Sequence, residues 1–154
     1  MVIGQILGAE QTVAWLGARR EAVQLAMRTT VRSLALQLTA YVKSNKLTGQ
    51  VLHVRSGRLR GHITFRVQDR GDIITGLVGT NVIYARIHEF GGHTKPHIIV
   101  PRNAKALHWG SHFAKIVHHP GSNMPERSFL RSSLREMEAV IKAELSLAMR
   151  EALK

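Results

Sequence analysis

The sequence has no cysteine, few aromatic residues and few acids. Without cysteine the chain can form neither a disulfide scaffold nor a thiolate zinc site, and it has no cysteine nucleophile. Aromatic residues make up 5% of the chain, which argues against the stacking platforms that bind single-stranded nucleic acid. No apolar run approaches the length of a membrane span, and the start MVIGQILGAE lacks the basic region of a secretory signal. We therefore expect a protein without membrane association that is made in the cytoplasm.

Basic residues outnumber acids, with 22 Lys and Arg against 10 Asp and Glu. The surplus lies mainly in residues 51–120, which hold 10 basic residues and 3 acids. Such a surplus favours association with DNA through counterion release, and it equally suits a solvated basic surface. The densest cluster is RSGRLRGH at 55–62, where Arg58 and Arg60 would point to the same side of an extended chain. No recognition-helix module is visible, so sequence-specific reading of DNA is not expected.

Two segments have the apolar periodicity of long helices. In residues 12–44 apolar side chains recur every three, four or seven positions, while most arginines can lie off that stripe. Gly49 is expected to end this helix. A second stripe begins at Leu130 and runs almost to the C-terminus. Each helix therefore has one apolar face that needs a partner.

The middle of the chain has the periodicity of strands. Residues 62–69 alternate between apolar and polar side chains, the turn DRGD follows, and residues 73–79 are a plausible antiparallel partner. Further short elements are expected, namely a helical turn within 82–90, strands at 97–100, 106–109 and 113–117, and an extended loop at 118–129.

The order of these elements predicts the α+β class, with a mostly antiparallel sheet packed by a long N-terminal helix and a long C-terminal helix. We expect one domain, residues 1–154, with residues 1–11 as a flexible arm. No internal repeat or low-complexity tract interrupts it.

The stretch HEFGGH at 88–93 is superficially similar to the H-E-x-x-H zinc motif of metalloproteases. The two histidines are five positions apart, however, which turns them about 140° from each other on a helix. Gly91 and Gly92 also disfavour a continuous helix through both histidines. A zinc protease is therefore not expected.

Other reaction centres are also unsupported. Seven histidines fall between positions 88 and 119, but Glu89 is the only acid between Asp72 and Glu126, and metal sites usually add carboxylates. The chain has no G-x-S-x-G elbow and no glycine-rich phosphate loop. We predict no catalytic residue, no metal ligand and no cofactor. A metal-dependent hydrolase using Glu89 or His93 is the enzyme alternative.

Four stretches, taken together, resemble the blocks of a known family. They occur in the same order and at similar spacing as in the virion-morphogenesis proteins of Mu-like and related tailed phages, which are also called neck or tail-completion proteins. His62 and Ser128 depart from that pattern, where the family usually has serine and proline. The four stretches are SGRLRGHI at 56–63, GTNVIYARIHEFGG at 79–92, PRNAKALHW at 101–109 and PERSFLRSSL at 125–134.

This resemblance implies a noncatalytic phage structural protein of the head-tail junction. The family's members are expected to form a ring of copies, with six as one expectation, through which the genome passes. The implied partners are other copies of the chain, other neck and tail proteins, and packaged DNA by nonspecific contact. The implied location is the virion, at the head-tail junction or tail end. A tail-tube terminator or minor tail protein is the nearest alternative, and a basic DNA-binding protein without a virion role is a more distant one.

The matched blocks single out structural-motif residues. Tyr84 and Phe90, with Ile87, are expected to pack a short helix onto the sheet, and Glu89 is expected to pair with Arg58 or Arg127. The motif residues are Gly57, Leu59, Tyr84, Glu89, Phe90, Gly91, Arg127, Phe129 and Leu130, and the candidate DNA-channel residues are Arg55, Arg58, Arg60 and Arg66.

Overall fold

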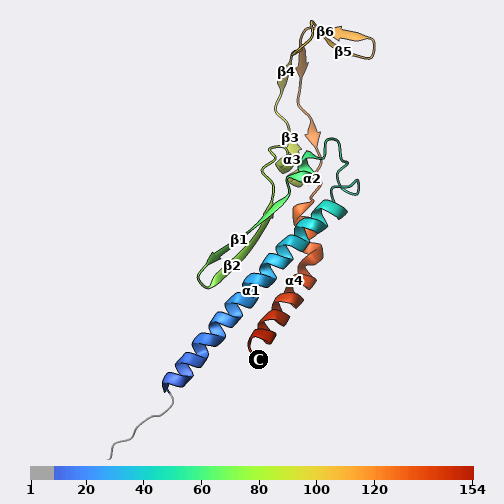
Figure 1. Ribbon diagram of the computed structural model, residues 1–154. Coiled ribbons are helices and arrows are strands. Elements are labelled where there is room, and N and C mark those ends of the chain that lie inside the picture. Colours follow the sequence, from blue (N-terminus) through green and yellow to red (C-terminus); the bar gives the residue numbers. More distant parts are fainter. Residues whose placement is uncertain (1–8) are drawn as a thin grey trace, which may run out of the picture. The chain divides into compact units, whose positions relative to one another are not determined.

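The computed structural model describes residues 9–154 and has the predicted α+β class (Figure 1). The chain divides into two compact units. The first, here the helical unit, comprises the chain up to Asn81 together with Phe129–Lys154, and the second, here the strand unit, is Val82–Ser128. Residues 1–8 of the expected flexible arm lie outside the described residues, and residues 9–11 belong to the first helix.

The helical unit contains two long helices and one β-hairpin. Helix α1 packs along α4 and along both strands of the hairpin (Figure 1). The β1–β2 ladder is in register from Thr64↔Gly79 to Arg70↔Ile73, as the alternation and the turn DRGD predict. The elements are α1 (Ala9–Asn45), α2 (Arg58–Gly61), β1 (Thr64–Arg70), β2 (Ile73–Gly79) and α4 (Leu130–Ala152).

The core of the helical unit lies where the second half of α1 meets the start of α4. Leu34 and Val42 from α1 are buried there, with Phe129 and Met137 from the α4 segment. The loop after α1 adds Leu47 and Leu52. The first half of α1 is mostly exposed, and no residue of α1 before Leu34 is buried among those the structure describes.

The strand unit consists of α3 and six very short strands. Its strands form three two-stranded antiparallel ladders, β3 with β8, β4 with β7 and β5 with β6. We call residues 97–119, which span β4 to β7, the ribbon. The bounds are α3 (Ala85–Phe90), β3 (Gly92–His93), β4 (His97–Ile99), β5 (Leu107–Trp109), β6 (His112–Ala114), β7 (Val117–His119) and β8 (Asn123–Met124).

The strands of the structure differ in part from the sequence-based expectation. The strand expected at 113–117 is divided, because residues 112–114 pair with β5 and residues 117–119 pair with β4. The loop expected at 118–129 contains the end of β7 and all of β8. The expected sheet exists as four separate two-stranded sheets within the part of the chain that the structure describes.

The basic stretch 55–62 also differs from an extended chain. Gly57 has a left-handed conformation, with φ of 70°, and begins the helical turn α2. The Gly61 amide donates to the Gly57 carbonyl at 2.8 Å. Arg58 and Arg60 are two positions apart in this turn, which separates their directions by about 200° in helical geometry. The two guanidinium groups therefore do not point to the same side, as they would in an extended chain.

Within residues 9–154, no helix is both long and apolar enough to cross a membrane.

Candidate assembly surfaces

The start of α4 is anchored in the helical unit. Phe129 precedes α4 and is fully buried. The Ser133 hydroxyl donates to the Phe129 carbonyl at 2.6 Å, and Ser133 is itself fully buried. Burial of an aromatic ring of this size contributes about 1.5–3 kcal/mol relative to exposure. Phe129 and the half-buried Leu130 thus lie where an anchor for the terminal helix is needed.

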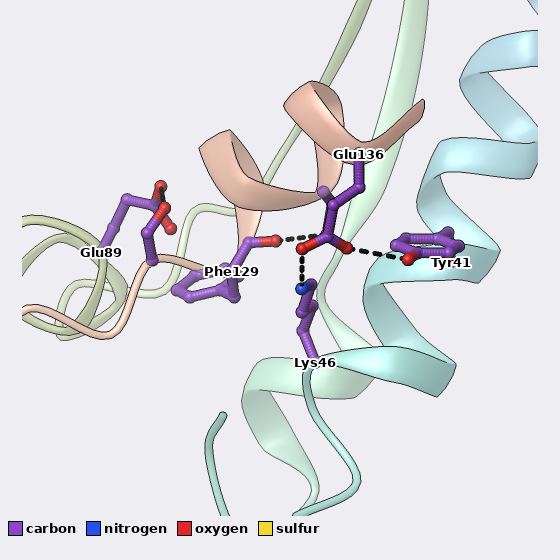
Figure 2. Close-up of polar contacts among 7 residues, drawn as sticks. Tyr41, Lys46, Glu89, Phe129 and Glu136 are labelled. Carbon is purple, nitrogen blue, oxygen red and sulfur yellow. Dashed lines mark hydrogen bonds and ion pairs between the residues drawn. The ribbon is translucent and has the colours of Figure 1, made fainter. Parts of the chain in front are cut away.

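Glu136 joins α4 to the end of α1 (Figure 2). Its carboxylate accepts a hydrogen bond from the Lys46 ammonium at 2.6 Å and another from the Tyr41 hydroxyl at 2.8 Å. The bonds from Lys46 and Tyr41 lower the pKa of Glu136. The Lys46 side chain is 11% exposed and the Glu136 side chain 44% exposed, so only the lysine end of this ion pair is shielded from water. The interaction leaves no signal in the sequence, because its partners are 90 or more positions apart.

Two aspartates hold the β1–β2 hairpin to α1. Asp72 accepts hydrogen bonds from Arg20 at 2.6 Å and from Gln24 at 3.3 Å. Asp69 is paired with Arg28. These contacts give both acids of the DRGD turn a structural role.

The HEFGGH stretch forms a corner of the strand unit. Helix α3 ends at Phe90, Gly91 adopts φ of 67°, and His93 belongs to β3. A Cβ atom on Gly91 would lie 2.8 Å from the backbone nitrogen of Glu126, so only glycine fits without a shift. The two histidines of the stretch therefore lie in different elements, and the zinc-protease arrangement is absent from this described segment.

Glu89 is the buried acid of this corner, with 4% of its surface exposed. The Ser128 hydroxyl donates to a Glu89 carboxylate oxygen at 2.7 Å, and the Arg127 amide donates to the His88 carbonyl at 2.8 Å. Ser128, which stands where the family usually has proline, thus contacts Glu89. An arginine partner for Glu89 stays a prediction. Tyr84 and Phe90 are exposed, whereas Ala85 and Glu89 are the buried residues of α3.

His88 has an unusual environment. Its Nδ1 atom is buried and has no hydrogen-bond partner. Burial lowers the pKa of His88, and the charge of Arg127 lowers it further. The Tyr84 ring meets the His88 ring edge-on, with centroids 6.0 Å apart. The folded protein therefore disfavours the protonated form of this imidazole.

The histidines do not gather into a metal site. Among residues 9–154 no three His, Asp or Glu side chains lie close enough together to hold an ion. His97 and His119 stack across the β4–β7 ladder with ring centroids 5.0 Å apart, and His119 accepts a hydrogen bond from the Gly121 amide. Their contacts are with each other and with backbone.

The candidate DNA-channel residues are all solvent-exposed. Arg55, Arg58 and Arg60 lie in or beside α2, and Arg66 lies on β1 opposite Leu77. These four side chains make no ion pair with any residue that the structure describes. Gly57 and the half-buried Leu59 accompany them, as the first family block implies.

The ribbon has no core of its own. Between Phe90 and Ser128, a segment described throughout, not one residue is buried. Large apolar side chains are instead exposed along it, at Ile98, Val100, Trp109, Phe113 and Ile116. Two-stranded ribbons are marginally stable in isolation. The ribbon is therefore suited to being covered by another surface.

The helical unit carries an apolar groove of about 690 Å³. It lies between the first half of α1, the start of β2 and the last turns of α4. Leu16, Val23 and Met27 line one wall, and Leu145 and Met149 line another. The Arg19 side chain donates to the Lys154 carbonyl at 2.6 Å, which ties the two helices together at one end of the groove.

The ribbon and the groove both expose large apolar side chains, and exposed apolar surface of this kind marks sites of contact with other molecules. A model of the phage virion morphogenesis family matches residues 18–146, and the chain belongs to this family. Its role therefore lies in the structure or assembly of phage particles. Searches of curated proteins and of solved structures find no match to the chain.

Proposed function

We propose that the protein is a noncatalytic neck or tail-completion component of the head-tail junction, and that it acts as a ring of copies during assembly. Family membership supports a role in building the particle. The observation that carries the ring is the ribbon, which exposes large apolar side chains and buries none of its residues among those described. Such a segment gains most of its stability from a neighbouring surface.

A ring requires two different surfaces on each subunit, because each copy contacts the next head to tail. The strand unit offers several candidates. The ladders beside His97 and in residues 118–129 are only two strands wide, so each leaves outer edges unpaired within the described chain. These edges and the exposed apolar side chains near them support subunit contacts there.

The exposed arginines of the helical unit support a further part of the proposal. Arg55, Arg58, Arg60 and Arg66 are accessible and have no acid partner among the described residues. In a ring around the genome they would attract phosphates without reading bases, which suits DNA that passes through.

The test is electron microscopy of a lysate in which the gene for this chain is disrupted in its parent phage. We expect DNA-filled heads beside separate, full-length tails, because a junction component is needed only when the two are joined. Tails of irregular length would instead favour a tail-tube terminator. Normal infectious particles would overturn the assembly role at the junction. Complementation with the intact gene is the control.

A further inference from the structure

The β1–β2 hairpin has two faces of different character. Side chains alternate between the faces along each strand, and α1 packs along one of them (Figure 1). An added Cβ on Gly76 would lie 3.1 Å from Val31 Cγ1 and 3.5 Å from Ala35 Cβ, both on α1. Gly76 and its ladder partner Val67 therefore belong to the inner face. We call the opposite side the outer face, and it carries Thr64, Arg66, Gln68 and Arg70 from β1 with Thr75 and Leu77 from β2.

The acids of the hairpin are bound to α1. Between positions 64 and 79, a segment that is described throughout, Asp69 and Asp72 are the only acids. Asp69 is paired with Arg28 of α1, as its place on the inner face requires. Asp72 lies in the turn and accepts hydrogen bonds from Arg20 and Gln24, which also belong to α1. Each carboxylate is therefore matched by a guanidinium group of the same unit, and the outer face carries no acid.

Two cations of the outer face have no acid partner. Arg66 and Arg70 are exposed, and neither makes an ion pair with any residue that the structure describes. They are four positions apart on one side of a strand, which separates their Cα atoms by about 13 Å. The major groove of B-DNA has a similar width, about 12 Å. Two guanidinium groups at this separation can each reach a phosphate on opposite sides of that groove.

The other side chains of the outer face are neutral. Thr64 and Thr75 are exposed and Gln68 is half-buried, and hydroxyl and amide groups of this kind donate to phosphate and sugar oxygens of DNA. Leu77 is 46% exposed and lies opposite Arg66 in the ladder. Cross-strand neighbours on one face are close enough for their side chains to touch. Leu77 can therefore support the methylene stem of the arginine while the guanidinium group faces outward.

We propose that the outer face of the hairpin lies against the phosphate backbone of duplex DNA. Arg66 and Arg70 bind phosphates by charge, and the neutral polar side chains donate to neighbouring backbone oxygens without reading a base. This inference rests on the proposed passage of the genome through the ring. It assigns the contact to one face of one element, and it adds Arg70 to the residues that face DNA.

The first test compares two full-length variants that each lose two positive charges. Arg66→Gln with Arg70→Gln changes the outer face, and Arg135→Gln with Arg150→Gln changes exposed positions of α4. Fluorescence anisotropy with a duplex of random sequence gives the affinity at several salt concentrations. The slope of log affinity against log salt should become shallower by roughly 1.8 in the outer-face variant, which is 0.9 for each of two phosphates, and should stay unchanged in the α4 variant. Equal slopes for the two variants would overturn the proposal.

The chain's lack of cysteine permits a second test with a single photo-crosslinker. Thr75→Cys, labelled with a benzophenone, places the reactive group on the outer face. The matched control is Gln37→Cys with the same label. Gln37 is exposed and lies two positions after Ala35, which faces the hairpin, so helical geometry turns it away by about 200°. We expect crosslinking to duplex DNA from position 75 and little from position 37, and comparable yields from the two positions would contradict the assigned face.

Failure of this proposal is distinguishable from failure of the proposed junction role. If the wild-type protein binds no duplex DNA even at low salt, the outer-face proposal is overturned. Separated heads and tails in the disrupted phage would still support the junction role in that case. Normal particles would remove the junction role, whereas crosslinking from Thr75→Cys together with a shallower slope for the outer-face variant would still establish the DNA contact.

Discussion

At the scale of the residue, His88 shows how burial changes the protonation of an imidazole. Its Nδ1 atom lies within the strand unit without a hydrogen-bond partner, and Arg127 adds an unfavourable charge to the protonated form. The pKa of this imidazole is consequently below its ordinary value of 6.5. His88 therefore affects the free energy of unfolding, because its imidazole binds a proton less readily in the folded chain than in the unfolded chain.

We predict that this histidine makes the fold sensitive to acid. As pH falls below 6.5, the unfolded chain binds the proton first, so the free energy of unfolding decreases until the lowered folded pKa is passed. His88→Phe should flatten that part of the profile. Denaturant titrations across this pH range measure it, with the exposed His53→Phe as the control. If the free energy of unfolding of His88→Phe depended on pH as strongly as that of the wild type, the lowered pKa of His88 would be contradicted.

Replacing either of two glycines by alanine should change the stability of the protein, in opposite directions. Gly91 has positive φ and faces the backbone of Glu126, so Gly91→Ala is expected to cost about 1–3 kcal/mol. Gly17 lies within α1 with nothing within 4 Å of an added Cβ, so Gly17→Ala should stabilise the helix by up to about 1 kcal/mol. Thermal unfolding monitored by circular dichroism measures both. Equal effects of the same sign would contradict the structural assignments of these glycines.

At the scale of the element, the α4 segment depends on its buried N-terminal anchor. Phe129→Ala removes a fully buried ring from the core that also contains Val42 and Met137 and is expected to destabilise the protein by about 3–5 kcal/mol. Phe129→Leu, which retains most of the apolar volume, should cost less than half as much. Urea unfolding midpoints compare the two. Similar losses of stability would show that ring burial is not the main contribution at this position.

The long elements can be predicted from the sequence because their signals are local. The apolar stripe before Ser44 and the one after Leu130 each specify a helix, and alternation specifies the β1–β2 hairpin. Helix α2 escapes sequence analysis because four residues carry no periodicity, and the left-handed Gly57 begins it. Strands β3 and β8 escape it because they are two residues long and depend on each other.

The candidate assembly surfaces are harder to predict from the sequence than the long elements. Residues such as Phe129 and Glu89 are identified by the resemblance to the family. No local pattern in the sequence identifies them. The groove requires three elements to meet, with Leu16 and Met149 more than a hundred positions apart. The Glu136 interaction with Lys46 and Tyr41 likewise depends on packing of α4 against α1. Contacts between distant segments leave no periodic signal in one sequence.

At the scale of the whole molecule, charge should govern any contact with the genome. Replacing Arg55, Arg58, Arg60 and Arg66 by alanine is expected to weaken binding to duplex DNA. The slope of log affinity against log salt should also become shallower, by roughly 0.9 for each phosphate that the variant no longer neutralises. Fluorescence anisotropy at several salt concentrations measures both quantities for the purified protein.

The control variant removes the same charge from the strand unit, at Arg86, Arg102, Lys105 and Lys115. If the helical-unit arginines face DNA, this control should retain most of the salt dependence. Equal reductions in the two variants would indicate a general effect of net charge, and a lack of binding by the wild-type protein at low salt would remove the DNA contact.

The shortness of the strands in the ribbon has a consequence for the life of the protein before assembly. Long open sheet edges on a free chain can template fibrous aggregates. The β4–β7 and β5–β6 ladders each span only three residues per strand. An incoming strand thus finds too few backbone groups along the ribbon to extend a stack, so the ribbon of a free chain is a poor template for fibres.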